Sequence, residues 1–82
     1  MQIDIYGKEN CTFCDKAATL AQKIAMQENG MTWQLLKLDE DYTADDLFAK
    51  APSAKTFPQI FVDDRLIGGF HQFLGWSQER QW

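Results

Sequence analysis

The sequence predicts an α/β domain in which three helices flank a four-stranded mixed β-sheet. Three observations support this prediction. β-type runs and helical patterns alternate over most of the 82 residues, and strands joined through helices pair in parallel. Two later β-type runs are separated only by a tight turn, which indicates an antiparallel pair. A last helical pattern follows, so the predicted order is β-α-β-α-β-β-α in a single domain over 1–82.

The first strand and the first helix are predicted near the N-terminus. A β-type run over 3–6 ends at Gly7. Apolar residues then recur at helical spacing over 11–29, with polar side chains on the opposite face. Gly30 follows directly, at a position where the C-terminus of a helix favours glycine. The apolar residues that define this helix are Phe13, Ala17, Leu20, Ala21 and Ile24.

The middle of the chain predicts a strand followed by a short helix. The strand covers 33–38. Thr43 then precedes two acidic residues and the apolar Leu47, which is typical of an N-cap with an acidic first turn. This helix ends before Pro52, because the residue that precedes a proline disfavours helical backbone angles.

The last third of the chain predicts a hairpin and a closing helix. Residues 59–62 form the third strand, 63–65 form a turn, and 66–67 form a short returning strand. Gly68 and Gly69 break the chain before the last helix. The apolar face of that helix carries Phe70, Phe73 and Leu74.

Composition narrows the classes of function. Apolar residues make up 45% of the chain and aromatic residues 13%, which supplies a core and argues against disorder. The net charge is −4, without a lysine or arginine cluster dense enough to bind a nucleic acid. No run approaches the roughly 20 apolar residues of a membrane span, and the N-terminus does not resemble a signal peptide. Two cysteines do not make a secreted disulfide framework, and together these observations indicate a cytoplasmic protein. Nothing in the sequence demands more than a monomer, so we expect one.

Cys11 and Cys14 lie where the first strand gives way to the first helix. Residues three apart at a helix start share one face, so their sulfurs can join with little backbone movement. Free amides and the helix dipole stabilise a thiolate there, and we expect the pKa of Cys11 to fall below the usual value of about 8.5. Lys8 would strengthen this effect and Asp15 would oppose it. Cys11 would attack a substrate disulfide, and Cys14 would then attack Cys11 to resolve the mixed disulfide.

The same cysteine spacing also occurs in half of a zinc site. Structural zinc takes four ligands, and beyond the two cysteines the chain offers one histidine, His71, and scattered carboxylates. A metal site would need a dimer or an outside ligand. The β-α-β context therefore favours redox chemistry, and we predict no metal.

Pro58 precedes the third strand in the segment Lys55-Thr56-Phe57-Pro58-Gln59. Proline cannot donate to a sheet ladder, so it marks the first residue of the strand. A trans bond would merely start the strand, whereas a cis bond would turn the backbone of Phe57 toward the sulfurs. X-Pro bonds are cis in only about one case in twenty, so these residues alone leave both possibilities open.

Three motifs occur in order along the chain: Cys11-Thr12-Phe13-Cys14, Thr56-Phe57-Pro58 and Ile67-Gly68-Gly69-Phe70. Over nearly the whole chain they resemble those of the glutaredoxins, and the third also resembles that of the compact glutaredoxins of large bacteriophages. In that family the usual motifs are CPYC, TVP with a cis proline, and a glycine pair followed by an acidic residue. The resemblance implies the thioredoxin fold, a cis Pro58 and a dithiol oxidoreductase for protein disulfides or glutathione mixed disulfides. Ribonucleotide reductase is the client that it suggests.

The resemblance also implies a groove for glutathione, which acts as a reductant and is not tightly bound. The backbone before the third strand would pair with the cysteinyl part, basic side chains would attract the glycine carboxylate, and an aromatic ring would line the groove. Amides at the start of the last helix would receive the γ-glutamyl carboxylate. The residues that match the cysteinyl-binding segment are Thr56, Phe57 and Pro58, and those that match the basic side chains are Lys8 and Lys55. Phe13 matches the aromatic ring, and Gly69, Phe70 and His71 match the start of the last helix.

Three positions depart from the family pattern. Thr12 replaces a proline, which should alter the stiffness and the reduction potential of the motif. Phe57 replaces a valine, and its bulk should narrow the groove. His71 stands where many relatives carry an aspartate that binds the glutathione ammonium, so we expect weaker glutathione binding that worsens at acid pH. The alternative is a solvent-facing His71 without a ligand role.

Two other functions fit the same motifs. The protein could be recharged directly by thioredoxin reductase, or two chains could bridge an iron–sulfur cluster through Cys11 with glutathione as the other ligands. The presence of Cys14 favours redox work over the cluster. Other aromatic residues have two possible roles: Tyr6 either shields the disulfide or packs in the core, and Trp76 and Trp82 either form an exposed patch or pack the last helix.

Overall fold

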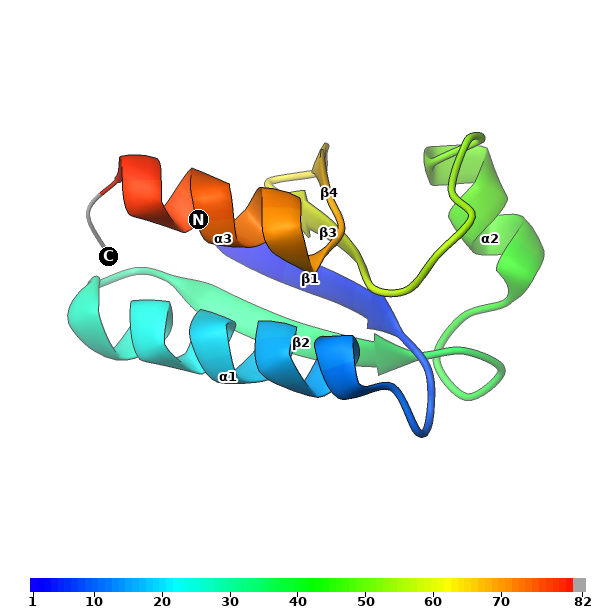
Figure 1. Ribbon diagram of the computed structural model, residues 1–82, viewed down its shortest axis with the longest axis horizontal. Helices are drawn as coiled ribbons and strands as arrows, with labels where there is room; N and C mark the ends of the chain where they lie inside the picture. The colour runs from blue at the N-terminus through cyan, green and yellow to red at the C-terminus, as the bar shows by residue number, and fades with distance from the viewer. Residues whose placement is uncertain (81–82) are drawn as a thin grey trace.

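A computed structural model describes residues 1–80, so the predicted role of Trp82 lies outside the described residues. The observed elements follow the predicted order (Figure 1). They are β1 (Gln2–Gly7), α1 (Thr12–Gln27), β2 (Thr32–Lys37), α2 (Ala44–Lys50), β3 (Gln59–Val62), β4 (Arg65–Gly68) and α3 (Phe70–Glu79).

The four strands form one mixed sheet in the order β2-β1-β3-β4. β1 and β2 pair in parallel across the α1 connection, and Ile5 stands opposite Leu35. β1 pairs antiparallel with β3, and β3 pairs antiparallel with β4 through the tight turn. The predicted mixed sheet is therefore confirmed. β1 lies in the interior of the sheet, and the C-terminal end of β1 lies between β2 and β3.

The helices divide between the two faces of the sheet. Successive side chains of a strand point to opposite faces, so Ile5 of β1 faces one side and Tyr6 faces the other. Ile5 belongs to the core cluster beneath α1 and α3, which lie side by side in Figure 1. Tyr6 belongs to a second cluster, which contains Leu47 and Ala51 from α2 and its C-terminal end. The buried members of the first cluster are Ile3, Ile5, Ala17, Ala21, Ile24, Met31, Ile60, Val62 and Phe73.

The C-terminus of α1 differs from the prediction. The helix ends at Gln27 rather than at residue 29, because Glu28 leaves the helical region with φ −122° and ψ 118°. Gly30 has φ +83°, a left-handed conformation that favours glycine. This glycine therefore shapes the turn into β2 instead of directly ending the helix.

The predicted start of α2 is confirmed. Thr43 is the N-cap, and its side chain accepts a hydrogen bond from the Asp46 amide. The Asp46 carboxylate accepts in return from the Thr43 amide, which completes a capping box. This start fixes the position of the loop that joins β2 to α2 and carries Tyr42.

Candidate active site

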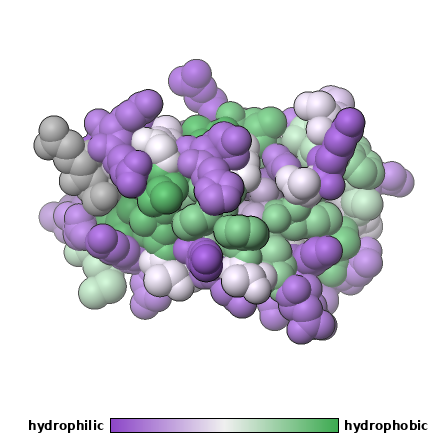
Figure 2. Space-filling model, in the orientation of Figure 1, coloured by the Kyte–Doolittle hydropathy of each residue, from purple (hydrophilic) through white to green (hydrophobic). Residues whose placement is uncertain are grey.

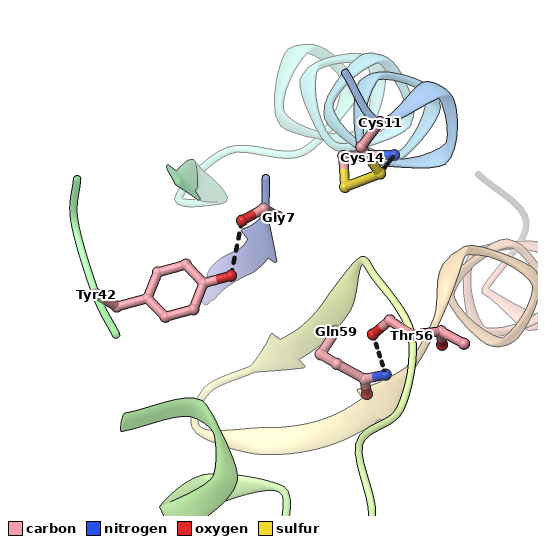
Figure 3. Close-up of a disulfide and its surroundings, with 6 residues drawn as sticks. All are labelled: Gly7, Cys11, Cys14, Tyr42, Thr56 and Gln59. Carbon is pink, nitrogen blue, oxygen red and sulfur yellow. Dashed lines mark hydrogen bonds between the residues drawn. A yellow bond between two sulfur atoms is a disulfide. The ribbon is translucent and has the colours of Figure 1, made fainter. Parts of the chain in front are cut away.

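Cys11 and Cys14 form a disulfide at the start of α1 (Figure 3). Their Cα atoms are 5.2 Å apart, within the range that a disulfide spans. Cys11 is the N-cap, with φ −122° and ψ 102°, and its Sγ accepts a hydrogen bond from the Cys14 amide at 3.2 Å. Cys11 is partly exposed, whereas Cys14 is only 1% exposed. The two sulfurs therefore differ in access to solvent, although they are covalently joined.

Gly7, the last residue of β1, lies directly against the buried sulfur. A Cβ atom added to Gly7 would stand 2.9 Å from Cys14 Sγ, 3.1 Å from Cys14 Cβ and 3.2 Å from Leu35 Cδ1. Real Cβ atoms do not approach a sulfur this closely without displacing it. The residue pattern identifies Gly7 only as the end of a strand. Its further role is to leave room for the disulfide.

A buried tyrosine holds the same glycine in place. The Tyr42 hydroxyl donates a hydrogen bond to the Gly7 carbonyl at 2.7 Å, as Figure 3 shows, and the Leu38 amide donates to the same oxygen at 2.9 Å. Tyr42 is 7% exposed, and its ring packs edge-on against Tyr6 at 4.9 Å. Tyr6 thus packs in the core rather than shielding the disulfide. No local pattern points to Tyr42, because its partner is a backbone carbonyl 35 residues away.

Burial raises the pKa of Tyr42 to about 12, with smaller contributions from Tyr6 and Asp39. The folded state therefore favours the neutral phenol of Tyr42. The stability that this phenol contributes to the fold is complete below pH 10 and is lost as the pH rises toward 12. We expect Tyr42→Phe to lower the free energy of unfolding at neutral pH by about 1 kcal/mol. The difference between the two free energies of unfolding should change by on the order of 2 kcal/mol between pH 10 and 12, so that Tyr42→Phe becomes the more stable protein. Urea denaturation of the two oxidised proteins measures it, and a constant difference would contradict the assignment.

The Phe57–Pro58 peptide bond is cis, which decides between the two possibilities that the sequence left open. Pro58 is buried, and its carbonyl oxygen lies 3.6 Å from the position of a Cβ added to Gly69. Gln59 Nε2 donates to the Thr56 carbonyl at 2.9 Å, as drawn in Figure 3. The segment before β3 is therefore fixed beside the glycine pair that precedes α3.

Three aromatic rings gather where the starts of α1 and α3 meet. The ring of Phe13 stacks on that of Phe70 at 5.9 Å and meets the His71 ring at 5.4 Å, and Phe70 and His71 are 5.7 Å apart. Phe13 is 43% exposed. The prediction that Phe13 belongs to the apolar face of α1 therefore needs correction, because its side chain lies outside the core and beside the cysteines.

The structure brings the other predicted residues into two further groups. Lys8 Nζ lies 5.3 Å from the centre of the Phe57 ring. Lys55 and Thr56 line a shallow polar pocket together with Gly69. The predicted site residues thus fall into local groups: the disulfide pair, the three rings, the Lys8–Phe57 contact and the pocket of Lys55, Thr56 and Gly69. In residues 1–80, no group of three or more histidine, cysteine or acidic side chains could hold a metal ion.

The family model for glutaredoxins matches residues 3–67. The chain belongs to the glutaredoxin family. It is 37% identical to Glutaredoxin 1 of Escherichia coli, and the alignment covers 96% of this chain and 95% of the relative. It is 33% identical to Glutaredoxin 3 of the same organism, over 82% of this chain and 75% of the relative.

Solved structures confirm the thioredoxin fold. The structure of reduced E. coli glutaredoxin superposes with a TM-score of 0.87 at 37% identity, and covers 96% of this chain and 95% of its own. The oxidised E. coli protein superposes with a TM-score of 0.84 at 36% identity, over 99% and 98% of the two chains. This glutaredoxin is accordingly a thiol–disulfide oxidoreductase whose redox pair is Cys11 and Cys14. In the described part of the chain, no helix has the length and apolar character needed to cross a membrane.

Proposed function

We propose that this glutaredoxin reduces protein disulfides and glutathione mixed disulfides with electrons from glutathione. The observation that carries the proposal is the unequal pair of sulfurs at the start of α1. Cys11 is partly exposed at the N-cap, where helix amides stabilise a thiolate, and Cys14 is buried one turn further on. This arrangement favours Cys11 as the nucleophile and Cys14 as the resolving thiol.

In the reducing half of the reaction, the Cys11 thiolate attacks one sulfur of a client disulfide. The client S–S bond breaks, a bond forms between Cys11 and the attacked sulfur, and the other client sulfur leaves as a thiolate. Cys14 then loses its proton and attacks Cys11 Sγ, which releases the second client thiolate. Two electrons have passed to the client, and the Cys11–Cys14 disulfide of the structure has formed.

Glutathione then restores the dithiol. A glutathione thiolate attacks Cys11 Sγ, the accessible sulfur, and Cys14 leaves as a thiolate. A second glutathione attacks the glutathione sulfur of this mixed disulfide, which frees Cys11 and produces glutathione disulfide. Because this direction of exchange needs a reducing pool, we propose that the protein works in the cytosol.

The groups around the disulfide support a glutathione site of the predicted kind. The cis bond fixes the backbone of Phe57, which would pair with the cysteinyl part as a short added strand. Lys8 and Lys55 would attract the glycine carboxylate, and Phe13 would line the groove. The Gly69 amide already donates to Gln72 Oε1 at 3.0 Å. The γ-glutamyl carboxylate would therefore be received by the next amides of α3, those of Phe70 and His71, which have no partner within the helix.

His71 provides a test of this site. Its imidazole lies at the start of α3, and a protonated ring would repel the ammonium group of glutathione. We expect His71→Asp to lower the KM for glutathione roughly two- to five-fold, as an exposed ion pair would. The substitution should also weaken the loss of affinity at acid pH. Equal KM values for the two proteins at acid pH would contradict this role, and turnover with dithiothreitol provides the control.

The second candidate is direct recharging by thioredoxin reductase, which His71 favours if its ring weakens glutathione binding. Steady-state reduction of a protein disulfide separates the two, with either glutathione and glutathione reductase or thioredoxin reductase as the electron source. The proposal expects turnover with glutathione. Turnover with thioredoxin reductase alone would overturn it. Ribonucleotide reductase is a suitable first client for this assay.

A further inference from the structure

A furrow between α1 and α3 begins at the N-terminal end of α1. It is a shallow hollow of about 430 Å³. It begins at Thr12, between the two cysteines, and runs along α1. Figure 2 shows hydrophobic residues gathered in a band across the face that α1 and α3 present, with polar residues on both sides. The lining residues are Thr12, Asp15, Lys16, Thr19, Leu20, Lys23 and Phe70.

The floor of the furrow is apolar. Leu20 and Phe70 are partly buried and pack against the main core. Phe70 stacks on the exposed ring of Phe13, which lies between the cysteines in the sequence. An apolar side chain placed on Leu20 would therefore meet a surface that includes Phe70, whose ring stacks on that of Phe13.

The rim of the furrow carries a charge opposite to that of the chain. Two exposed lysines of α1, Lys16 and Lys23, line the furrow, and Asp15 is the single carboxylate among the lining residues. The lining is thus net positive, whereas the chain as a whole carries −4. A partner segment with acidic side chains would gain from the two lysines, and a basic segment would be repelled.

We infer that this furrow docks the client segment that flanks the attacked cysteine, and that it selects an acidic segment with one bulky apolar side chain. The inference rests on the proposed function, because it names the clients of the same redox site. Of the proposed glutathione residues, Phe70 lines the furrow, whereas Lys8, Lys55 and Phe57 do not. Docking would therefore act on protein clients more than on small disulfides.

The spacing along α1 predicts a pattern in the client. At 1.5 Å per residue, Lys16, Leu20 and Lys23 lie roughly 7, 13 and 18 Å along the helix from Cys11. An extended segment advances about 3.3 Å per residue, so it reaches these points roughly two, four and five residues from its cysteine. The expected pattern is acidic, apolar and acidic at those positions, in whichever direction the segment runs.

A peptide of sequence Glu-Leu-Ser-Glu-Ser-Cys-Ser-Glu-Ser-Leu-Glu presents this pattern in both directions. Its disulfide-linked dimer is mixed with the reduced protein in the absence of glutathione, and the second-order rate is compared with that of hydroxyethyl disulfide. We expect replacement of every glutamate by lysine to slow the reaction about ten-fold. Replacement of both leucines by serine should also slow it, and high salt should reduce the charge preference.

A pair of matched variants tests whether the charge preference arises from the furrow. Lys23→Glu should slow reduction of the acidic peptide roughly two- to five-fold and speed that of the lysine peptide. Arg65→Glu makes the same change in net charge on β4, outside the furrow, and should leave both rates as they were. Equal effects of the two variants, or equal rates for all peptides, would overturn the docking inference. Failure to reduce hydroxyethyl disulfide would instead count against the proposed redox function.

Discussion

Replacement of Cys11 by serine is expected to abolish reduction of both protein disulfides and glutathione mixed disulfides. Every step of the proposed reaction forms or breaks a bond at Cys11 Sγ, and a serine hydroxyl lacks the acidity to take its place at neutral pH. The coupled assay with glutathione and glutathione reductase should therefore show only the background rate. The fold should persist, because Cys11 is a partly exposed cap residue and serine is a favourable N-cap.

Cys14→Ser is the matched control for this experiment. In the proposed reaction, Cys14 acts only on a mixed disulfide that Cys11 has already formed, so the loss of Cys14 should spare the reduction of glutathione mixed disulfides. Reduction of protein disulfides should stall, because the client stays attached to Cys11. If Cys11→Ser kept its activity while Cys14→Ser lost all of it, the roles of the two cysteines would be exchanged.

Gly7→Ala is expected to damage both stability and activity, although Gly7 carries no reactive group. The new Cβ would stand 2.9 Å from Cys14 Sγ, and this sulfur cannot swing away while it is bonded to Cys11. Overpacking of this kind costs about 1–3 kcal/mol of folding free energy. Displacement of the resolving sulfur should slow protein disulfide reduction roughly 10- to 100-fold. Urea denaturation of the oxidised protein and the coupled assay measure the two effects.

Gly75→Ala provides the control for the substitution itself. Gly75 lies within α3, and a Cβ added there meets no atom within 4 Å. Alanine should therefore raise the free energy of unfolding by about 0.5–1 kcal/mol, because it has the higher helix propensity. Similar effects of the two alanines would show that the contact between Gly7 and Cys14 does not limit the site.

The order of the elements could be predicted because each has a local signal. The apolar spacing over α1, the Thr43 cap of α2 and the short turn before β4 depend on residues close in sequence. The cysteine pair could be placed at a helix start for the same reason. Trp76 packs on Phe73 at 5.8 Å, so the packing interpretation of this residue is confirmed.

The support beneath the disulfide could not be predicted from local patterns. The contact of Gly7 with Cys14 depends on how β1 meets α1, and the hydrogen bond from Tyr42 depends on where the loop before α2 returns. The cis state of Pro58 depends on tertiary context, and these residues alone left it open. Phe13 fitted a helical apolar pattern, yet its position in the first turn places it outside the core.

In the proposed reaction, the accessible sulfur of Cys11 exchanges with glutathione while Cys14 remains buried behind it. The most direct test is to incubate reduced Cys14→Ser and Cys11→Ser proteins with glutathione disulfide and locate the adduct by mass spectrometry of the intact and digested chains. We expect rapid formation of one glutathione adduct on Cys11 in the Cys14→Ser protein, and none on Cys14 in the Cys11→Ser protein. Preferential modification of Cys14, or no adduct in either protein, would contradict the proposed reaction.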